Sequence, residues 1–273
     1  FINETHDLPV VTVSTQPDNL WSDESGIYVR GTNGISGNCE GPVNWNQDWE
    51  IPIHIELYEK DGTKAFALGA GAKIFGGCSR SYPAKSLAIF FRSEYGSSSL
   101  KYKMFEGKDI EEFQAIVLRN SGNDFTSQGH SMIRDGMMTN LIKDTEVELQ
   151  AYRQAVLYLN GEYWGIHNIR EKVNEHFIAS NSGADANNID VLEGDGWEIQ
   201  GTREKYDELL NYLSTNDLSD SAAYMGVEEL IDINSYVDYM ASQIYFANTD
   251  WPGNNIKFWR ERSQEGKFRW IIY

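Results

Sequence analysis

An acidic residue and an amide five positions apart, Asp250 and Asn255, form the pair in this sequence whose spacing most directly indicates chemistry. Phosphoryl-transfer enzymes use a carboxylate to accept the proton of an attacking hydroxyl, and a nearby amide oxygen to hold a metal ion. Pro252 and Gly253 favour a bend between them, since proline fixes φ and glycine tolerates positive φ. The run therefore predicts a phosphotransfer loop, although its spacing alone also fits an ordinary surface turn.

A second candidate is the loop of small residues that precedes Lys85 and contains Ser79 and Arg80. Residues 72–92 have the pattern of a strand, a loop and a second strand, with Lys85 entering that second strand. Backbone N–H groups of such a loop can approach an anion, and a lysine then supplies a point charge. The pattern indicates a phosphate site, and its alternative is a tight hairpin with a surface lysine. No Walker A spacing is present.

A third candidate is Asp135, in a predicted helix over residues 129–146. Met132, Met137 and other apolar residues recur at helical spacing and give this segment an apolar face. Asp135 lies one turn from Met132, so its carboxylate could form an ion pair with Lys85. The alternative is a solvated charge on the helix surface.

The elements that must position these residues change in type along the chain. Alternating or apolar runs predict strands at 8–14, 27–29, 51–59, 65–68, 113–118, 155–159 and 162–169, the last two joined by an Asn-Gly turn. Beyond about residue 170, helical spacing predicts helices at 173–179, 202–213, 221–230 and 233–246. Two short strands, 255–260 and 267–273, follow the Asp250 loop. Residues 31–48 and 180–196 have the composition of loops. The fold class predicted is α+β.

Composition excludes several classes of function. The chain has 273 residues, of which 41% are hydrophobic and 13% aromatic, so it can bury a sizeable core. With 23 Lys and Arg against 41 Asp and Glu, its net charge is −18. Such a field repels nucleic acid and anionic membranes and attracts cations or basic polypeptides, although a soluble extracellular surface is the simpler explanation of the charge. No run of 18 apolar residues predicts a membrane span.

The two cysteines, Cys39 and Cys78, leave two readings open. They form one disulfide of an exported protein, or they are unrelated thiols. Neither belongs to a C-x-x-C motif, and the five histidines share no metal-ligand spacing, so zinc is not expected. Motifs of the common hydrolases, G-x-S-x-G and H-E-x-x-H, are absent from the sequence.

Several runs together resemble the CotH-type atypical protein kinases, the spore coat protein H-like family. The matching runs are SRSYPAKSL at 79–87, LRN at 118–120, LYLNGEYWGI at 157–166, EK at 171–172, NTDW at 248–251 with NN at 254–255, and FRWIIY at 268–273. The resemblance extends from about residue 50 to the end of the chain. The NGEYWG and N-x-DW runs are its most specific parts.

This resemblance implies a kinase-like, two-lobed fold with a β-rich N-lobe and a helical C-lobe. Residues 1–50 would be a β-rich N-terminal segment, 51–170 the nucleotide-binding part, and 171–273 the helical C-lobe with the catalytic loop. The family's Asp-rich metal segment would follow Tyr273, so the C-terminal part would be truncated. We therefore expect the intact protein to be a kinase and this 273-residue form to be impaired.

The resemblance also implies transfer of the γ-phosphate of ATP, with Mg²⁺ (or Mn²⁺ or Ca²⁺), to Ser or Thr of partner proteins. Asp250 would be the catalytic base, Asn255 or Asn254 a metal ligand, and Lys85 a phosphate contact. Glu171 would lie beside the nucleotide, as would Ser79, Arg80 and Asp135 in the segments described above.

Partners and location follow from the same resemblance. The family is bacterial, and its substrates in spore formers are coat proteins rich in Ser and basic residues. Other members are exported modules of cell-surface or polysaccharide-degrading systems, so we expect a secreted protein at the cell or spore surface. Two alternatives remain. The chain could be a non-catalytic, carbohydrate-associated binding module that binds glycans and no nucleotide, or a structural scaffold that binds neither.

Overall fold

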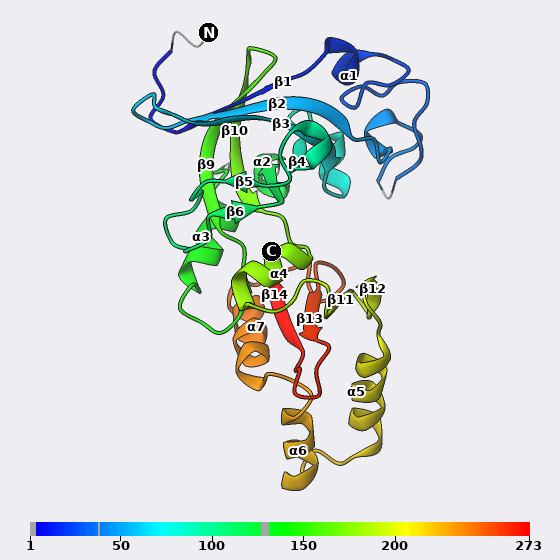
Figure 1. Ribbon diagram of the computed structural model, residues 1–273. Coiled ribbons are helices and arrows are strands. Elements are labelled where there is room, and N and C mark those ends of the chain that lie inside the picture. Colours follow the sequence, from blue (N-terminus) through cyan, green and yellow to red (C-terminus); the bar gives the residue numbers. More distant parts are fainter. Residues whose placement is uncertain (1–3, 38, 127–130) are drawn as a thin grey trace. The chain divides into compact units, whose positions relative to one another are not determined.

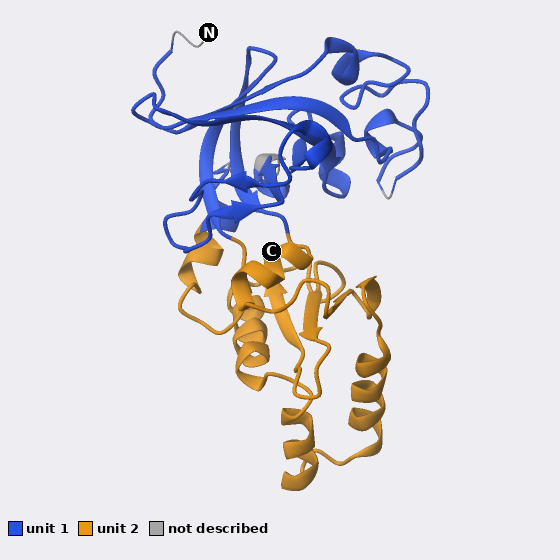
Figure 2. Cartoon of the chain, in the orientation of Figure 1, with its two compact units in different colours: residues 1–136, 151–172 blue, residues 137–150, 173–273 orange. Residues whose placement is uncertain are grey.

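The computed structural model describes residues 4–37, 39–126 and 131–273 and has a mixed α+β composition. The chain divides into two compact units (Figure 2). Unit 1 comprises residues 1–136 and 151–172, and unit 2 comprises residues 137–150 and 173–273. No helix among the described residues is both long enough and apolar enough to cross a membrane.

Unit 1 is built on a closed barrel of seven strands (Figure 1). In spatial order they are β1 (Val10–Ser14), β2 (Ile51–Tyr58), β3 (Lys64–Phe75), β4 (Ser86–Phe90), β7 (Ala115–Arg119), β10 (Glu162–Glu171) and β9 (Tyr152–Leu159). Strand β1 closes the barrel, because it pairs antiparallel with β2 and parallel with β9. The N-terminal residues thus contribute a strand to the same barrel as the later segments.

The barrel interior follows from the period-two pattern that the sequence predicts for its strands. In β2 buried and more exposed residues alternate, with Ile53, Ile55 and Leu57 facing the core. The hairpin of β9 and β10 turns at Asn160 and Gly161, whose φ angles of 49° and 84° suit the Asn-Gly turn predicted there. The alternating strand at residues 51–59 and the Asn-Gly hairpin are therefore confirmed.

Strand β3 is longer than the sequence indicates. The residues Gly69-Ala70-Gly71 continue it, whereas alternation predicted separate strands on either side. A Cβ atom at Gly69 would lie 2.2 Å from the carbonyl oxygen of Tyr95. Glycine is needed here because another segment approaches the strand's backbone closely, and such packing leaves no local signal.

Short elements surround the barrel. They are α1 (Pro17–Trp21), η1 (Asn44–Asn46), η2 (Cys78–Ser81), η3 (Ser93–Tyr95), β5 (Leu100–Lys101), β6 (Glu112–Phe113) and α2 (Asn123–Thr126). The apolar run 27–29 forms a turn and no strand.

The predicted helix over 129–146 is shorter in the structure. Helix α3 spans Arg134–Leu141; Gly129 and His130 lie outside the described residues. Met132 has a φ of 61°, which a right-handed helix cannot include, so the helix begins after it. Met137 and Leu141 belong to the apolar face predicted for this helix, and both side chains are largely exposed.

Unit 2 combines a five-stranded sheet with four complete helices and the C-terminal part of α3, Met137–Leu141, among its described residues. The sheet order is β12 (Trp197–Gln200), β11 (Ile189–Glu193), β13 (Lys257–Glu261), β14 (Arg269–Ile272) and β8 (Glu148–Leu149). The helices are α4 (Glu175–Ser182), α5 (Glu204–Thr215), α6 (Ser221–Glu228) and α7 (Ile233–Tyr245). The predicted helices and the β13–β14 pair are confirmed to within a few residues.

Strand β11 corrects the prediction of a loop over 180–196. Its residues are almost wholly buried, and its central carboxylate, Asp190, pairs with Arg260 at 3.0 Å and Arg262 at 2.7 Å. A charged residue in a short strand resembles a loop in sequence, because the partners that neutralise it are about seventy positions away. Phe258 of β13, Phe268 just before β14, and other aromatic residues of β14 and α7 form the core beside it.

Candidate active site

The Asp250 loop connects helix α7 with strand β13 in unit 2. Asn248 anchors it at the end of the helix. Its backbone N–H donates to the Gln243 carbonyl at 3.1 Å, and its Nδ2 donates to Gln243 Oε1 at 2.8 Å. Its own Oδ1 accepts from the backbone N–H of Asp250 at 3.1 Å. The helix end therefore fixes the backbone position from which the Asp250 side chain projects.

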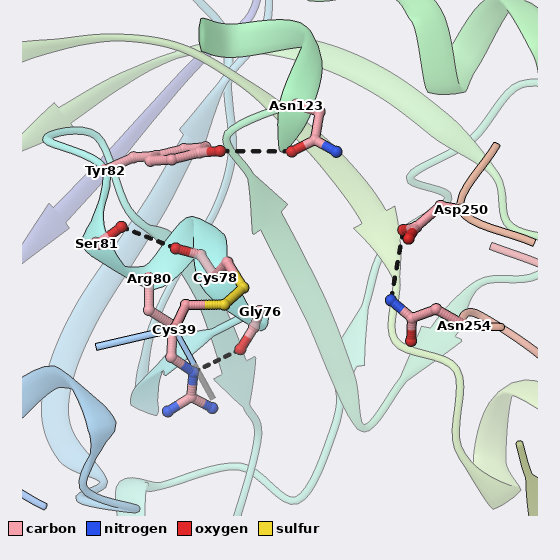
Figure 3. Close-up of a disulfide and its surroundings, with 9 residues drawn as sticks. All are labelled: Cys39, Gly76, Cys78, Arg80, Ser81, Tyr82, Asn123, Asp250 and Asn254. Carbon is pink, nitrogen blue, oxygen red and sulfur yellow. Dashed lines mark hydrogen bonds between the residues drawn. A yellow bond between two sulfur atoms is a disulfide. The ribbon is translucent and has the colours of Figure 1, made fainter. Parts of the chain in front are cut away.

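The carboxylate of Asp250 contacts both candidate metal-ligand amides. Its Oδ2 accepts from Asn255 Nδ2 at 2.7 Å and from Asn254 Nδ2 at 3.4 Å, and Figure 3 shows the second of these bonds. Asn255 has a φ of 56°, a conformation that asparagine tolerates better than most residues. The predicted spacing thus brings one carboxylate and two amides together on an exposed loop of unit 2.

The loop predicted to bind phosphate lies in unit 1 and is fixed by a disulfide. Cys39 and Cys78 form a disulfide, with their Cα atoms 5.2 Å apart (Figure 3). Of the two interpretations that the sequence left open, the structure therefore agrees with the disulfide. Arg80 donates through Nε to the Gly76 carbonyl and through Nη1 to the Trp45 carbonyl. Ser79, half-buried in η2, accepts a backbone hydrogen bond from Tyr82.

Lys85 is buried at the end of this loop, with 3% of its surface exposed. Its Nζ donates to the carbonyls of Arg80 and Tyr82 and lies 3.8 Å from the centre of the Trp45 ring. Burial lowers the pKa of Lys85 to about 8, and the charge of Glu40 opposes that shift. The side chain of Lys85 therefore stabilises the loop through hydrogen bonds to two of its own carbonyls. It forms no salt bridge in the described part of the chain.

The structure does not bring Asp135 to Lys85. Asp135 accepts a hydrogen bond from Arg119 Nε, and its Oδ2 lies 3.4 Å from Arg170 Nη1. Lys85 cannot reach it because its ammonium is held by the two loop carbonyls. An ion pair between a strand and helix α3 exists, but its cation is Arg119 at the end of β7. The sequence signal for Arg119 was the LRN run, to which no role was assigned.

Glu171, expected beside a nucleotide, is buried at the end of β10. Its Oε2 accepts from Lys108 Nζ at 2.6 Å and from the backbone N–H of Ala151 at 2.7 Å. These contacts hold the end of β10 to the loop between β5 and β6 and to the residue that precedes β9.

Among the described residues no group of three or more His, Cys, Asp or Glu side chains could hold a metal ion. The oxygen donors suited to a divalent cation in the Asp250 loop are therefore the Asp250 carboxylate and the amide oxygens of Asn254 and Asn255. Mg²⁺ fits this set, since it prefers oxygen ligands and takes few of them from protein when phosphates supply others.

Comparison with known families places these residues in context. The sequence profile of the CotH kinase protein family matches residues 72–273. The chain belongs to the CotH kinase family. No curated protein matches the sequence. The CotH match includes the Asp250 loop, the Lys85 loop, Arg119, Asp135 and Glu171, so every candidate residue lies within the part of the chain that defines the family.

Proposed function

We propose that this chain is a CotH-type protein kinase that transfers the γ-phosphate of ATP to a Ser or Thr hydroxyl. The observation that carries the proposal is the contact between Asp250 and Asn255 in a chain of the CotH kinase family. A carboxylate and an amide are the two groups that phosphoryl transfer requires beside the acceptor and the metal. The family relationship supports kinase chemistry, and Ser/Thr specificity and a kinase-like two-lobed fold are part of the proposal.

The geometry of Asp250 fits the role of base. One oxygen, Oδ2, is held by the two amides, while Oδ1 has no hydrogen-bond partner among the described residues. Oδ1 would take the proton of the substrate hydroxyl as the hydroxyl oxygen forms a bond to the γ-phosphorus. The bond from that phosphorus to the β–γ bridging oxygen breaks, and ADP leaves with its electron pair. Asn248 would keep the carboxylate in place during this step.

Asn255 and Asn254 would hold the divalent cation. The Nδ2 of Asn255 donates to Asp250, so its Oδ1 is the atom left to serve as a ligand. When bound, Mg²⁺ (or Mn²⁺ or Ca²⁺) would neutralise negative charge on the phosphates. Residues 248–255 include no cysteine or histidine that could compete as a ligand. This composition favours a cation that prefers oxygen ligands.

The loop that contains Lys85 would supply positive charge to the nucleotide. Lys85 would contact a phosphate after exchanging the carbonyls of Arg80 and Tyr82 for phosphate oxygens. Backbone groups around Ser79 and the guanidinium of Arg80 would contribute from the same loop. Glu171 would lie near the nucleotide as part of β10.

The partner and location proposed are those of an exported enzyme. A net charge of −18 favours a Ser-containing protein substrate rich in basic residues. The disulfide supports an oxidising compartment, which suits the cell or spore surface or a polysaccharide-associated assembly.

The test is transfer of labelled phosphate from ATP, with Mg²⁺ or Mn²⁺, by the protein to a Ser/Lys-rich peptide. Asp250→Asn should lower the rate by at least about a hundredfold, because general-base catalysis contributes that much. Asp217→Asn, at an exposed carboxylate on a turn before α6, is the matched control and should retain full activity. Full activity in Asp250→Asn would refute the assignment of the base. Glycan binding without nucleotide binding would favour the carbohydrate-associated module.

A further inference from the structure

Arg170 is a buried cation that the proposed mechanism does not use. It lies near the end of β10, and 1% of its surface is exposed. Its Nε, Nη1 and Nη2 make no hydrogen bond to any described residue, and Asp135 Oδ2 lies 3.4 Å from Nη1. An arginine carries five N–H donors, and leaving them unsatisfied in a buried site is costly. Such a group marks a place where another acceptor can bind.

A second guanidinium shares the same carboxylate. Arg119, on the neighbouring strand β7, donates to Asp135 through Nε. Burial lowers the pKa of Arg170 to about 10; the Asp135 charge opposes this shift, and the Arg119 charge reinforces it. Two cations and one carboxylate leave an excess positive charge at this position.

Other carboxylates of unit 1 near this cluster already have cationic or N–H partners. Asp124 accepts from Ser131 Oγ at 2.7 Å and from the backbone N–H of Arg134 at 3.1 Å. Glu171 is held by Lys108 at 2.6 Å and also receives the Ala151 N–H. The charge of Glu171 also attracts Arg170, since it opposes the fall in the pKa of that guanidinium, but Glu171 is already ion-paired with Lys108.

Tyr152 adds a third donor to the same face of the barrel. It is directly opposite Arg170 in the register of β9 and β10, so both side chains project from the same face. Its hydroxyl is buried and has no hydrogen-bond partner among the described residues. Burial raises its pKa to about 12, so it stays a donor at neutral pH. Three adjacent strands, β7, β10 and β9, thus present Arg119, Arg170 and Tyr152.

We propose that Arg119, Arg170 and Tyr152 form an oxyanion site for the terminal phosphate of a nucleoside triphosphate. The side chains of Arg119 and Asp135 are 29% and 25% exposed, so the cluster meets solvent on their side. A phosphate dianion that entered there would balance the excess positive charge. Its oxygens would accept hydrogen bonds from the N–H groups of both guanidinium groups, and the planar guanidinium can donate two such bonds in parallel. That the ligand is a nucleotide rests on the proposed kinase function. That the three side chains bind an oxyanion does not depend on it.

The probe is pyrophosphate, titrated against the 273-residue chain by calorimetry and by its effect on the thermal midpoint. Wild type should bind it, and Arg170→Met and Arg119→Met should each weaken binding by about tenfold or more. Arg92→Met, at an exposed arginine of unit 1 that pairs with Glu50, is the matched control and should bind as wild type does. The affinity for adenosine, which has no phosphate, should be the same in wild type and in all three variants.

Unliganded stability distinguishes a binding role from a structural one. Methionine fills much of the volume of Arg170 without a buried charge, so Arg170→Met should be at least as stable as wild type. A lower thermal midpoint with unchanged pyrophosphate affinity would show a structural ion pair and overturn the proposal. Arg119→Met, at a partly exposed site, keeps the test valid if Arg170→Met does not fold.

The pyrophosphate experiment and the phosphate-transfer experiment can fail independently of each other. Phosphate transfer by wild type, with pyrophosphate affinity unchanged in both methionine variants, would overturn the oxyanion site and leave the kinase intact. Pyrophosphate binding that depends on Arg119 and Arg170, without transfer from ATP, would support the site and refute the kinase. Failure of wild type to bind pyrophosphate at millimolar concentration would overturn the site outright.

Discussion

Asp135 on helix α3 is shared by two arginines, accepting a hydrogen bond from Arg119 and lying 3.4 Å from the guanidinium of Arg170. This carboxylate lies within ion-pair distance of a guanidinium that is buried and has no hydrogen-bond partner among the described residues. It ties the start of the helix to strands β7 and β10 within unit 1. Its charge is therefore expected to matter more to folding than its partial exposure suggests.

Replacing Asp135 by asparagine keeps the shape of the side chain and removes this charge. The two guanidinium groups would then repel each other, with the charge of Glu171 left to offset part of that repulsion. We expect the free energy of unfolding to fall by about 2 kcal/mol, less than for a fully buried pair because Asp135 is partly exposed. Urea denaturation measures the change, and Asp217→Asn should leave the midpoint where it is. Equal stability of Asp135→Asn and wild type would mean that the carboxylate does not offset the charge of Arg170.

Asn248 positions Asp250, so its loss should affect catalysis more than binding. Asn248→Ala removes the side-chain bonds to Gln243 Oε1 and to the Asp250 N–H. Each such bond contributes about 1 kcal/mol, and we expect kcat for phosphate transfer to fall by about tenfold with little change in KM for ATP. Asn211→Ala, at an exposed asparagine of α5, is the matched control and should keep the wild-type kcat. A fall in kcat as large in Asn211→Ala as in Asn248→Ala would contradict this role.

The disulfide should stabilise the loop that holds Lys85. Cys39 and Cys78 are 39 positions apart, and closing a loop of that length stabilises a protein by about 2–4 kcal/mol. Cys39→Ala with Cys78→Ala should therefore lower the thermal midpoint, and treatment of wild type with a reductant should lower it similarly. The reductant should have no further effect on the double variant. A shift in that variant would show that reduction acts elsewhere.

The hairpin and helices were predictable because their signals are local. The turn at Asn160 and Gly161 and the helices of unit 2 depend on residues within one or two turns of each other. Strand β11 escaped prediction since Asp190 is neutralised by Arg260 and Arg262, whose proximity exists only in the fold. The continuity of β3 through Gly69 likewise depends on Tyr95, which the sequence pattern does not connect to it.

The same distinction applies to the candidate site. The contact between Asp250 and Asn255 was predictable, since both belong to one short loop. The partner of Asp135 was not, because choosing between Lys85 and Arg119 requires knowing which strand end faces α3. Burial also decides the state of Lys85, which turns back to its own loop and lies over Trp45. Charge and spacing indicated which residues matter but not which of them meet.

His167 gives the barrel a defined response to acid. It is fully buried on β10, and its Nε2 lies 3.2 Å from the carbonyl oxygen of Lys85, to which it must donate. Burial lowers its pKa to about 4, while the unfolded chain has the ordinary value of 6.5. Between these pH values the unfolded state takes up a proton that the folded state does not. The stabilisation is therefore complete above pH 6.5 and is lost as the pH falls towards 4.

The pKa difference corresponds to a loss of about 3 kcal/mol from this residue across that range. Urea denaturation at several pH values between 7 and 4 measures it. His167→Asn cannot be protonated, so its stability should fall less steeply with acid than that of wild type, whatever its stability at pH 7. His54→Gln, at an exposed histidine on β2, should keep the wild-type slope. Equal slopes for His167→Asn and wild type would show that His167 is not the group that titrates, because only a buried neutral imidazole produces the difference.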